Sequence, residues 1–167
     1  YTHPRLTQLR QSAIHNDANN YNVIVGSRDN DLYNRNQKVI GLIDFGDMVY
    51  SYTVGELAVA IAYAILSKDD PLATAVQLVN GYHQEYPLTE DEISALFGLV
   101  SMRLATSICL AAYQLSHRPG DEYLNISQEP IRRTLPKLLQ IQPRFAEAAF
   151  RQACGLPPLP ASVRVVE

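Results

Sequence analysis

The feature that most constrains this chain is a pair of polar motifs joined by two short apolar runs. The first motif, at 15–22, reads H-x-D-x-x-x-x-N, and the second, at 43–47, reads I-D-F-G-D. The two runs between them are strand candidates: Asn22–Val25 and Lys38–Ile43. The polar residues 26–37 between the strands predict a turn. An antiparallel hairpin would bring Asn22 and Asp44 to the same end, so both motifs are expected to form one site.

The residue types in these motifs suit phosphoryl transfer, which needs an oriented hydroxyl and metal ions that neutralise phosphate charge. Kinases supply these functions from an H-R-D loop, with an Asn five residues after the Asp, and from a D-F-G Asp. Here Asp17 is the candidate catalytic base, or the carboxylate that orients the acceptor hydroxyl. Asn22 and Asp44 are the candidate Mg²⁺ ligands. The alternatives are an Asx turn at Asp17 and capping of strand ends by the other two residues.

Together the motifs resemble the aminoglycoside phosphotransferase and choline kinase superfamily, whose members carry H-[GN]-D-x-x-x-x-N, a strand, and I-D-F-[GE]. The chain matches this pattern at His15, Asp17, Asn22 and Asp44, with Asn16 where Gly is more usual. The resemblance implies the C-terminal lobe of a protein-kinase-like fold, mainly α with a small β-hairpin, which binds Mg²⁺ and GTP or ATP. No nucleotide-covering loop with its phosphate-binding Lys is recognisable before the first motif. We therefore expect a fragment that lacks its N-terminal lobe and is inactive alone.

Four further runs resemble the hydroxylysine kinase family: Ile43–Ser51, Ala60–Ala64, Tyr86–Glu90 and Arg103–Ser107. This resemblance implies transfer of the γ-phosphoryl group of GTP or ATP to a small acceptor with an amino group, 5-hydroxylysine. Bacterial modules of this kind are often fused to a class III aminotransferase, which is one expected context. The alternatives are an aminoglycoside, choline or other amino-alcohol kinase and, from a different class, a catalytically silent scaffold domain.

Three residues near the motifs are candidates for support or for substrate binding. His15 is expected to pack under the D-F-G segment and bond its backbone rather than act as the base. Asp47 is expected either to bind a substrate ammonium or to cap the next helix. Glu56 follows Thr53 with the spacing of a capping box. Substrate binding is one alternative for Glu56, and the resemblance implies another, since the superfamily has an acid there that braces the catalytic loop.

Arg103 lies in an apolar sequence at 101–112, and a buried Arg needs a partner. One hypothesis is that it binds the carboxylate of an amino-acid substrate through a bidentate fork. The other is an internal ion pair, or a surface Arg that buries only its stem. Tyr63 and Tyr113 are expected either to line the acceptor pocket or to pack in the core.

The remaining chain has helical patterns at 1–11, 53–67, 71–85, 89–116, 127–141 and 143–154. A second capping box at Thr89–Glu92 begins the fourth pattern, and Gly98 is a candidate break within it. Its portion at 99–114 is apolar nearly all round, which predicts a buried central helix. A turn is predicted at Arg118–Asp121. We expect a kinase-like domain at 1–155, with a helical substrate subdomain at 53–154, and a linker or tail at 156–167.

Composition bounds the remaining possibilities. The 167 residues suffice for one domain, and the net charge of −3 gives no support for a nucleic-acid partner. The apolar runs at 54–66 and 104–112 are too short or too interrupted to span a bilayer, so no membrane partner is expected. Cys109 and Cys154 lie in apolar helical sequence, which predicts buried free thiols rather than a disulfide and suits a reducing cytoplasm.

Overall fold

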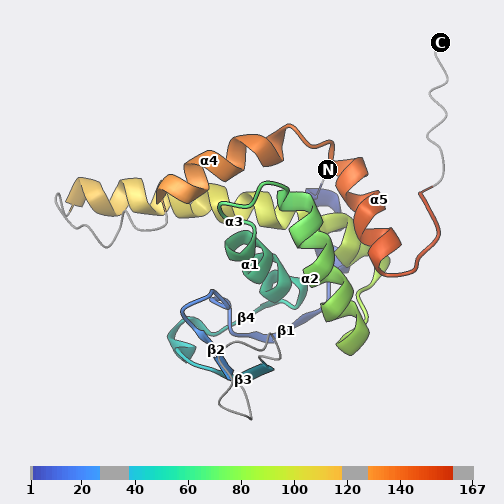
Figure 1. Ribbon diagram of the computed structural model, residues 1–167, viewed down its shortest axis with the longest axis horizontal. Helices are drawn as coiled ribbons and strands as arrows, with labels where there is room; N and C mark the ends of the chain where they lie inside the picture. Colours follow the sequence, from blue (N-terminus) through green and yellow to red (C-terminus); the bar gives the residue numbers. More distant parts are fainter. Residues whose placement is uncertain (1, 27–37, 118–127, 160–167) are drawn as a thin grey trace.

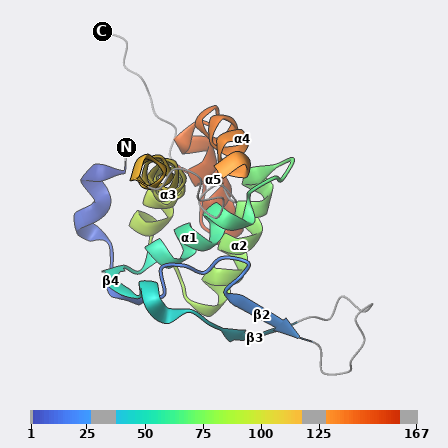
Figure 2. The same ribbon diagram turned by 90° about the vertical axis from the view of Figure 1, so that its left-hand side faces the viewer.

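A computed structural model of the chain describes residues 2–26, 38–117 and 128–159. The predicted class, mainly α with a small β-hairpin, is confirmed: the strands gather at one end of a helical body (Figures 1 and 2). In chain order the elements are η1 His3–Gln8, β1 Gln11–Ile14, β2 Val23–Gly26, β3 Lys38–Leu42, η2 Phe45–Asp47, β4 Val49–Tyr52, α1 Val54–Ala64, α2 Pro71–Glu85, α3 Glu90–His117, α4 Gln128–Leu139 and α5 Pro143–Ala153. The predicted turns at 27–37 and 118–121, and residues 160–167 of the predicted tail, lie outside the described residues.

The predicted hairpin is present as β2 and β3, which pair antiparallel from Val23 opposite Leu42. Figure 2 shows it extending away from the helices. Beyond the last pair, the backbone N–H of Ile43 donates to the carbonyl of Asn22 over 3.0 Å. Asn22 and the residue after Ile43, Asp44, therefore leave the hairpin at the same end, as expected.

A second antiparallel pair, β1 with β4, was not predicted. Strand β1 precedes the first motif, and strand β4 follows the second. The register of this pair runs from Gln11 opposite Tyr52 to Ile14 opposite Val49. The first motif leaves β1 directly after Ile14, and the second reaches β4 after one intervening residue. Each motif is thus fixed by one ladder at each end. The helix predicted at 1–11 is correspondingly shorter, because the chain becomes extended at Gln11.

The helical body is built around α1, which packs against α2, α3 and β4. Helix α2 begins as predicted: Asp70 Oδ1 accepts from the N–H of Ala73 over 2.9 Å. Helix α3 begins with the predicted capping box, since Thr89 and Glu92 each accept a hydrogen bond from the other's backbone N–H.

The capping box predicted at Thr53 is wrong. Thr53 already has helical angles, φ −55° and ψ −42°, and makes no side-chain cap hydrogen bond. The chain enters α1 straight from β4, and Thr53 Oγ1 instead lies 2.9 Å from Ser12 Oγ on β1. This hydroxyl pair ties the start of α1 to the strand that leads into the first motif.

Helix α3 runs unbroken through Gly98, so the candidate break is absent. The predicted burial at 99–114 holds only in part: Leu104 and Ala111 are buried, whereas Met102, Leu110 and Tyr113 are 56%, 52% and 65% exposed. By length and composition α3 could cross a membrane, but 44% of its most apolar window is buried inside the molecule. Many core helices pass the same test, and α3 packs against α1, α4, α5 and η1.

Two ion pairs attach peripheral segments to the start of α3. Arg10, between η1 and β1, forms a bidentate pair with the fully buried Glu92, with nitrogen–oxygen distances of 2.9 and 2.6 Å. Arg151 on α5 donates to Glu90 over 3.1 Å and to the carbonyl of Pro157 over 2.9 Å. The described start of the predicted tail is therefore bonded to the body.

The two cysteines are free, as predicted, but only one is shielded from solvent. Cys109 is exposed on α3, so its predicted burial is wrong. Cys154 is half-buried after α5, and burial raises the pKa of its thiol above the ordinary value. The difference arises because most residues around Cys109 in the second half of α3 are exposed.

Candidate active site

The first motif forms a loop whose backbone is in a sparsely populated conformation. Asn16 has φ +64°, in the left-handed region that few residues other than Gly and Asn adopt readily. Its N–H donates to Glu56 Oε2 on α1 over 3.0 Å. This explains why Gly or Asn suits position 16, and it places Glu56 as a brace of the loop, one of the alternatives left open for it.

His15 supports the loop from beneath. Its ring is 6% exposed, and Nδ1 accepts from the backbone N–H of Asp17 over 3.3 Å. Nε2 therefore carries the proton and donates to the carbonyl of Ile43 over 2.9 Å. The ring also meets Phe45 edge-on, with centroids 5.0 Å apart. His15 thus joins the two motifs, and both of its nitrogens are engaged in doing so.

The two oxygens of the Asp17 carboxylate differ in how fully they are bonded. Oδ2 accepts from the side-chain amides of Asn19 and Asn22, each over 2.9 Å. Oδ1 is approached by Nη2 of Arg103 at 3.5 Å. The two amides fix the plane of the carboxylate, and Oδ1 keeps only this long contact, so it is the oxygen that could take an acceptor. The role of Asn19 was not predicted, because the sequence shows it only as one of several polar residues in the first motif.

Asn22 and Asp44 were predicted to meet at a metal ion, and their donor chemistry fits Mg²⁺. Asn22 gives its Nδ2 hydrogen bonds to the main chain and side chain of Asp17, which leaves its amide oxygen as the group that can face a cation. Asp44 is exposed in the left-handed conformation, φ +64°, and one oxygen accepts a long hydrogen bond of 3.4 Å from Gly46. Strained conformations of this kind concentrate at functional sites.

Within residues 2–26, 38–117 and 128–159, no three His, Cys, Asp or Glu side chains converge as a metal-binding cluster. Mg²⁺ does not require one, because it usually takes one or two carboxylates and completes its shell with water and phosphate oxygens.

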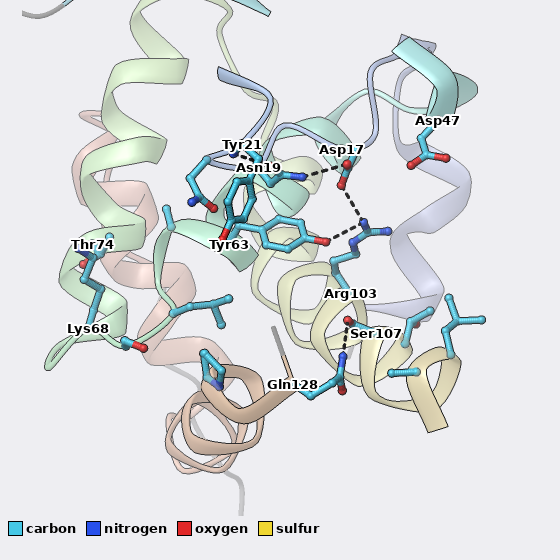
Figure 3. A pocket seen from close by; sticks show the side chains of 18 of the residues that line it. Asp17, Asn19, Tyr21, Asp47, Tyr63, Lys68, Thr74, Arg103, Ser107 and Gln128 are labelled. Carbon is cyan, nitrogen blue, oxygen red and sulfur yellow. Dashed lines mark hydrogen bonds and ion pairs between the residues drawn. The ribbon is translucent and has the colours of Figure 1, made fainter. Parts of the chain in front are cut away.

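A cavity of about 1060 Å³ lies on the side of Asp17 that faces the helices (Figure 3). It is bounded by the first motif, the end of α1 with the turn after it, the second half of α3, and the start of α4. Asp47 lines it, but Asp44 and Glu56 do not. Leu110 on α3 lines the cavity, which accounts for its exposure, whereas the exposed Cys109 and Tyr113 lie outside the lining.

Arg103 and Tyr63 lie together beside the Asp17 carboxylate (Figure 3). Nη2 of Arg103 donates to the Tyr63 hydroxyl over 3.3 Å, and the guanidinium lies 5.8 Å from the centre of the Tyr63 ring. Tyr63 lines the cavity, whereas Tyr113 does not.

Asp47 does not cap the next helix, because β4 separates it from α1. Its other expected role, contact with a substrate ammonium, stays a prediction; Asp47 lies in the cavity wall.

Gln128 is a lining residue that no sequence pattern singled out. It is 6% exposed, and its Nε2 approaches Ser107 Oγ at 3.5 Å. Its Oε1 is buried and has no hydrogen-bond partner among the residues that the structure describes. A buried amide oxygen of this kind becomes visible only once α3 and α4 are packed together.

Residues 2–92 match the model of the phosphotransferase enzyme family, which is more than half of the chain. The chain belongs to this family. The match includes both motifs together with Glu56, and ends at the start of α3. The family agrees with the resemblance and with the kinase-like fold that it implied.

Similar curated proteins carry one name. The chain is 35% identical to hydroxylysine kinase of Xenopus laevis over 126 residues, which is 74% of this chain and 34% of that protein. It is 34% identical to hydroxylysine kinase of Bos taurus over 123 residues, 73% of this chain and 33% of that protein. With the protein of the same name from Mus musculus, identity is 31% over 144 residues, 86% and 38% of the two chains. The chain spans about a third of the length of these relatives. No solved structure matches the chain significantly.

Proposed function

We propose that this chain provides the acceptor and metal sites of a kinase that transfers the γ-phosphoryl group of GTP or ATP to the hydroxyl of 5-hydroxylysine. Its membership of a phosphotransferase family sets the reaction class. The relatives named hydroxylysine kinase suggest the acceptor.

The observation that carries the proposal is the orientation of Asp17. Asp17 lines the cavity, and with Oδ2 held by Asn19 and Asn22, Oδ1 is the oxygen left for an acceptor. An acceptor hydroxyl that donates to Oδ1 is oriented for attack and can pass its proton to the carboxylate as the new bond forms. His15 is unsuited to this task, because both of its nitrogens are already bonded within the loop.

Asn22 and Asp44 would hold Mg²⁺. When bound, the ion supplies neutralisation of charge on the transferred phosphoryl group. Because Asp44 does not line the cavity and Asp47 does, the two carboxylates of the second motif divide between the phosphate side and the acceptor side. Asp47 is then placed for the ε-ammonium, which lies on the carbon next to the one that carries the hydroxyl.

The test is an acceptor panel on the full-length protein with GTP and with ATP, scored by product phosphorylation. We expect 5-hydroxylysine to be phosphorylated, with Asp17→Asn lowering kcat by about 10²–10⁴-fold. Asp44→Asn is expected to raise the Mg²⁺ concentration needed for half-maximal activity, because a carboxylate ligand is lost, and to lower kcat. Preference for choline or an aminoglycoside would replace the acceptor but keep the mechanism. Failure to bind or hydrolyse any Mg-nucleotide would instead favour a silent scaffold.

A further inference from the structure

Arg103 is unusually poorly satisfied for a partly buried cation. Its side chain is 29% exposed, yet its two polar contacts are long, 3.5 Å to Asp17 and 3.3 Å to Tyr63, and both use Nη2. Its Nε is buried and has no hydrogen-bond partner within the described part of the chain. Among the described residues Nη1 donates to no group either, so most of the five N–H donors of the guanidinium are unused.

An internal ion pair would look different. Arg10 and Glu92 in the same molecule form a bidentate pair at 2.9 and 2.6 Å, which is the geometry of a guanidinium and a carboxylate that satisfy each other. Asp17 already gives Oδ2 to two amides and offers Arg103 a single oxygen at the limit of hydrogen bonding. Asp17 therefore balances the charge of Arg103 without saturating it.

The cavity supplies the place for a better partner. Arg103 lines it beside Asp17 and Tyr63, and the other cationic residue in its described wall, Lys68, lies in the turn after α1. The described lining carboxylates are Asp17 and Asp47, so an acceptor carboxylate that enters beside Asp17 would find a fork of N–H donors at Arg103.

We infer that Arg103, positioned by the Tyr63 hydroxyl, is the recognition group for the carboxylate of the acceptor, so that the site selects amino acids over other amino alcohols. This inference rests on the proposed function. Arg103 and Asp17 are neighbours in the cavity wall, so a short aliphatic chain can join a carboxylate at the first to a hydroxyl at the second. Carboxylate recognition at this point therefore also presents the hydroxyl to Asp17.

The experiment compares two acceptors in the full-length protein: 5-hydroxylysine, and 1,5-diaminopentan-2-ol, which is the same molecule without its carboxylate. For the wild type we expect kcat/KM to favour the amino acid by about 10–100-fold, as for a charge-assisted hydrogen bond. Arg103→Ala should reduce this preference to about twofold or less, mainly because the amino acid binds more weakly and its KM rises. Arg103→Lys, which keeps charge but loses the fork, should give an intermediate preference. Arg133→Ala, which removes an exposed Arg paired with Glu129 on α4, should leave the preference unchanged.

A binding measurement separates this inference from the proposed function. L-Lysine and 1,5-diaminopentane lack the hydroxyl and cannot be phosphorylated there, so calorimetry with them reports carboxylate recognition alone. If lysine binds through Arg103 but no acceptor is phosphorylated, the proposed function fails and the inference stands. If Arg103→Ala impairs both acceptors equally, Arg103 only positions Asp17 and the inference is wrong. It is also wrong if Lys68→Ala, rather than Arg103→Ala, abolishes the preference.

Discussion

At the scale of single residues, the site is made by contacts between residues far apart in the chain. Motif spacing was enough to select Asp17, Asn22 and Asp44, because each task in phosphoryl transfer needs a specific oxygen or carboxylate. Glu56 shows the limit of such reading. The same acid can bond the first turn of its own helix or a loop 40 residues away, and only the angle at which the chain enters α1 decides between them.

Glu56 as a brace leads to a prediction for stability. Glu56→Ala leaves the N–H of Asn16 without its acceptor and should lower the free energy of unfolding by about 1–3 kcal/mol. Glu56→Gln keeps an amide oxygen that can accept from Asn16, so its loss should be smaller. Urea denaturation measures both. Equal stability of the Ala variant and the wild type would show that the loop does not depend on Glu56.

At the scale of elements, sequence patterns predicted the helices and strands whose own residues form caps or turns. They missed the strands that form only by pairing with a distant strand. The hairpin, α2 and the capping box of α3 all have side chains or turns that act within a few residues. Strands β1 and β4 are four residues each, lack a clear alternation, and are stabilised by each other across 35 residues. The prediction of a break at Gly98 was wrong for a related reason. Gly98 lies against the side chain of Thr2, which is outside the helix and far away in the sequence.

Gly98 and Gly81 form a matched pair that tests this point. Both lie inside helices, where Gly→Ala normally stabilises by about 0.5–1 kcal/mol. A Cβ at Gly81 would meet nothing within 4 Å, so Gly81→Ala should show this gain. A Cβ at Gly98 would collide with the side chain of Thr2, next to η1, so Gly98→Ala should gain less or destabilise. Thermal denaturation of the two variants measures the difference, and equal gains would show that Thr2 yields without cost.

At the scale of the whole molecule, two ladders at one end fix the motifs, and the helices form the cavity beside them. Sequence patterns predicted the β2–β3 ladder and most of the helices, but neither the β1–β4 ladder nor the residues that form the cavity together. Its wall combines residues from 17 to 130, and most of them, such as Thr106 and Gln114, have no chemical signature when read alone. They acquire a common role only after α1, α3 and α4 are packed, which is a property of tertiary structure.

The attachment of the first motif to the helical body should depend on pH through Glu92. Burial alone would raise its pKa, but hydrogen bonds from Arg10 and Thr89 outweigh this effect and hold the pKa below the ordinary value of 4.5. The unfolded chain therefore takes up the proton at higher pH than the folded one. The stabilisation is complete above this range and is lost as the pH falls through the folded-state pKa.

Glu92→Gln removes the charge and should lower the free energy of unfolding near neutral pH. We expect a loss of about 1–3 kcal/mol, discounted because the Arg10 side chain is 38% exposed. Urea denaturation at several pH values should show the gap between wild type and variant shrinking below pH 4.5, where Glu92 of the wild type takes up its proton. Glu129→Gln, from an exposed i,i+4 pair with Arg133, is the control and should change stability by less than about 0.5 kcal/mol. A gap that stays constant through the acid range would mean that Glu92 stabilises by packing rather than by its charge, and that Arg10 does not anchor β1 through this pair.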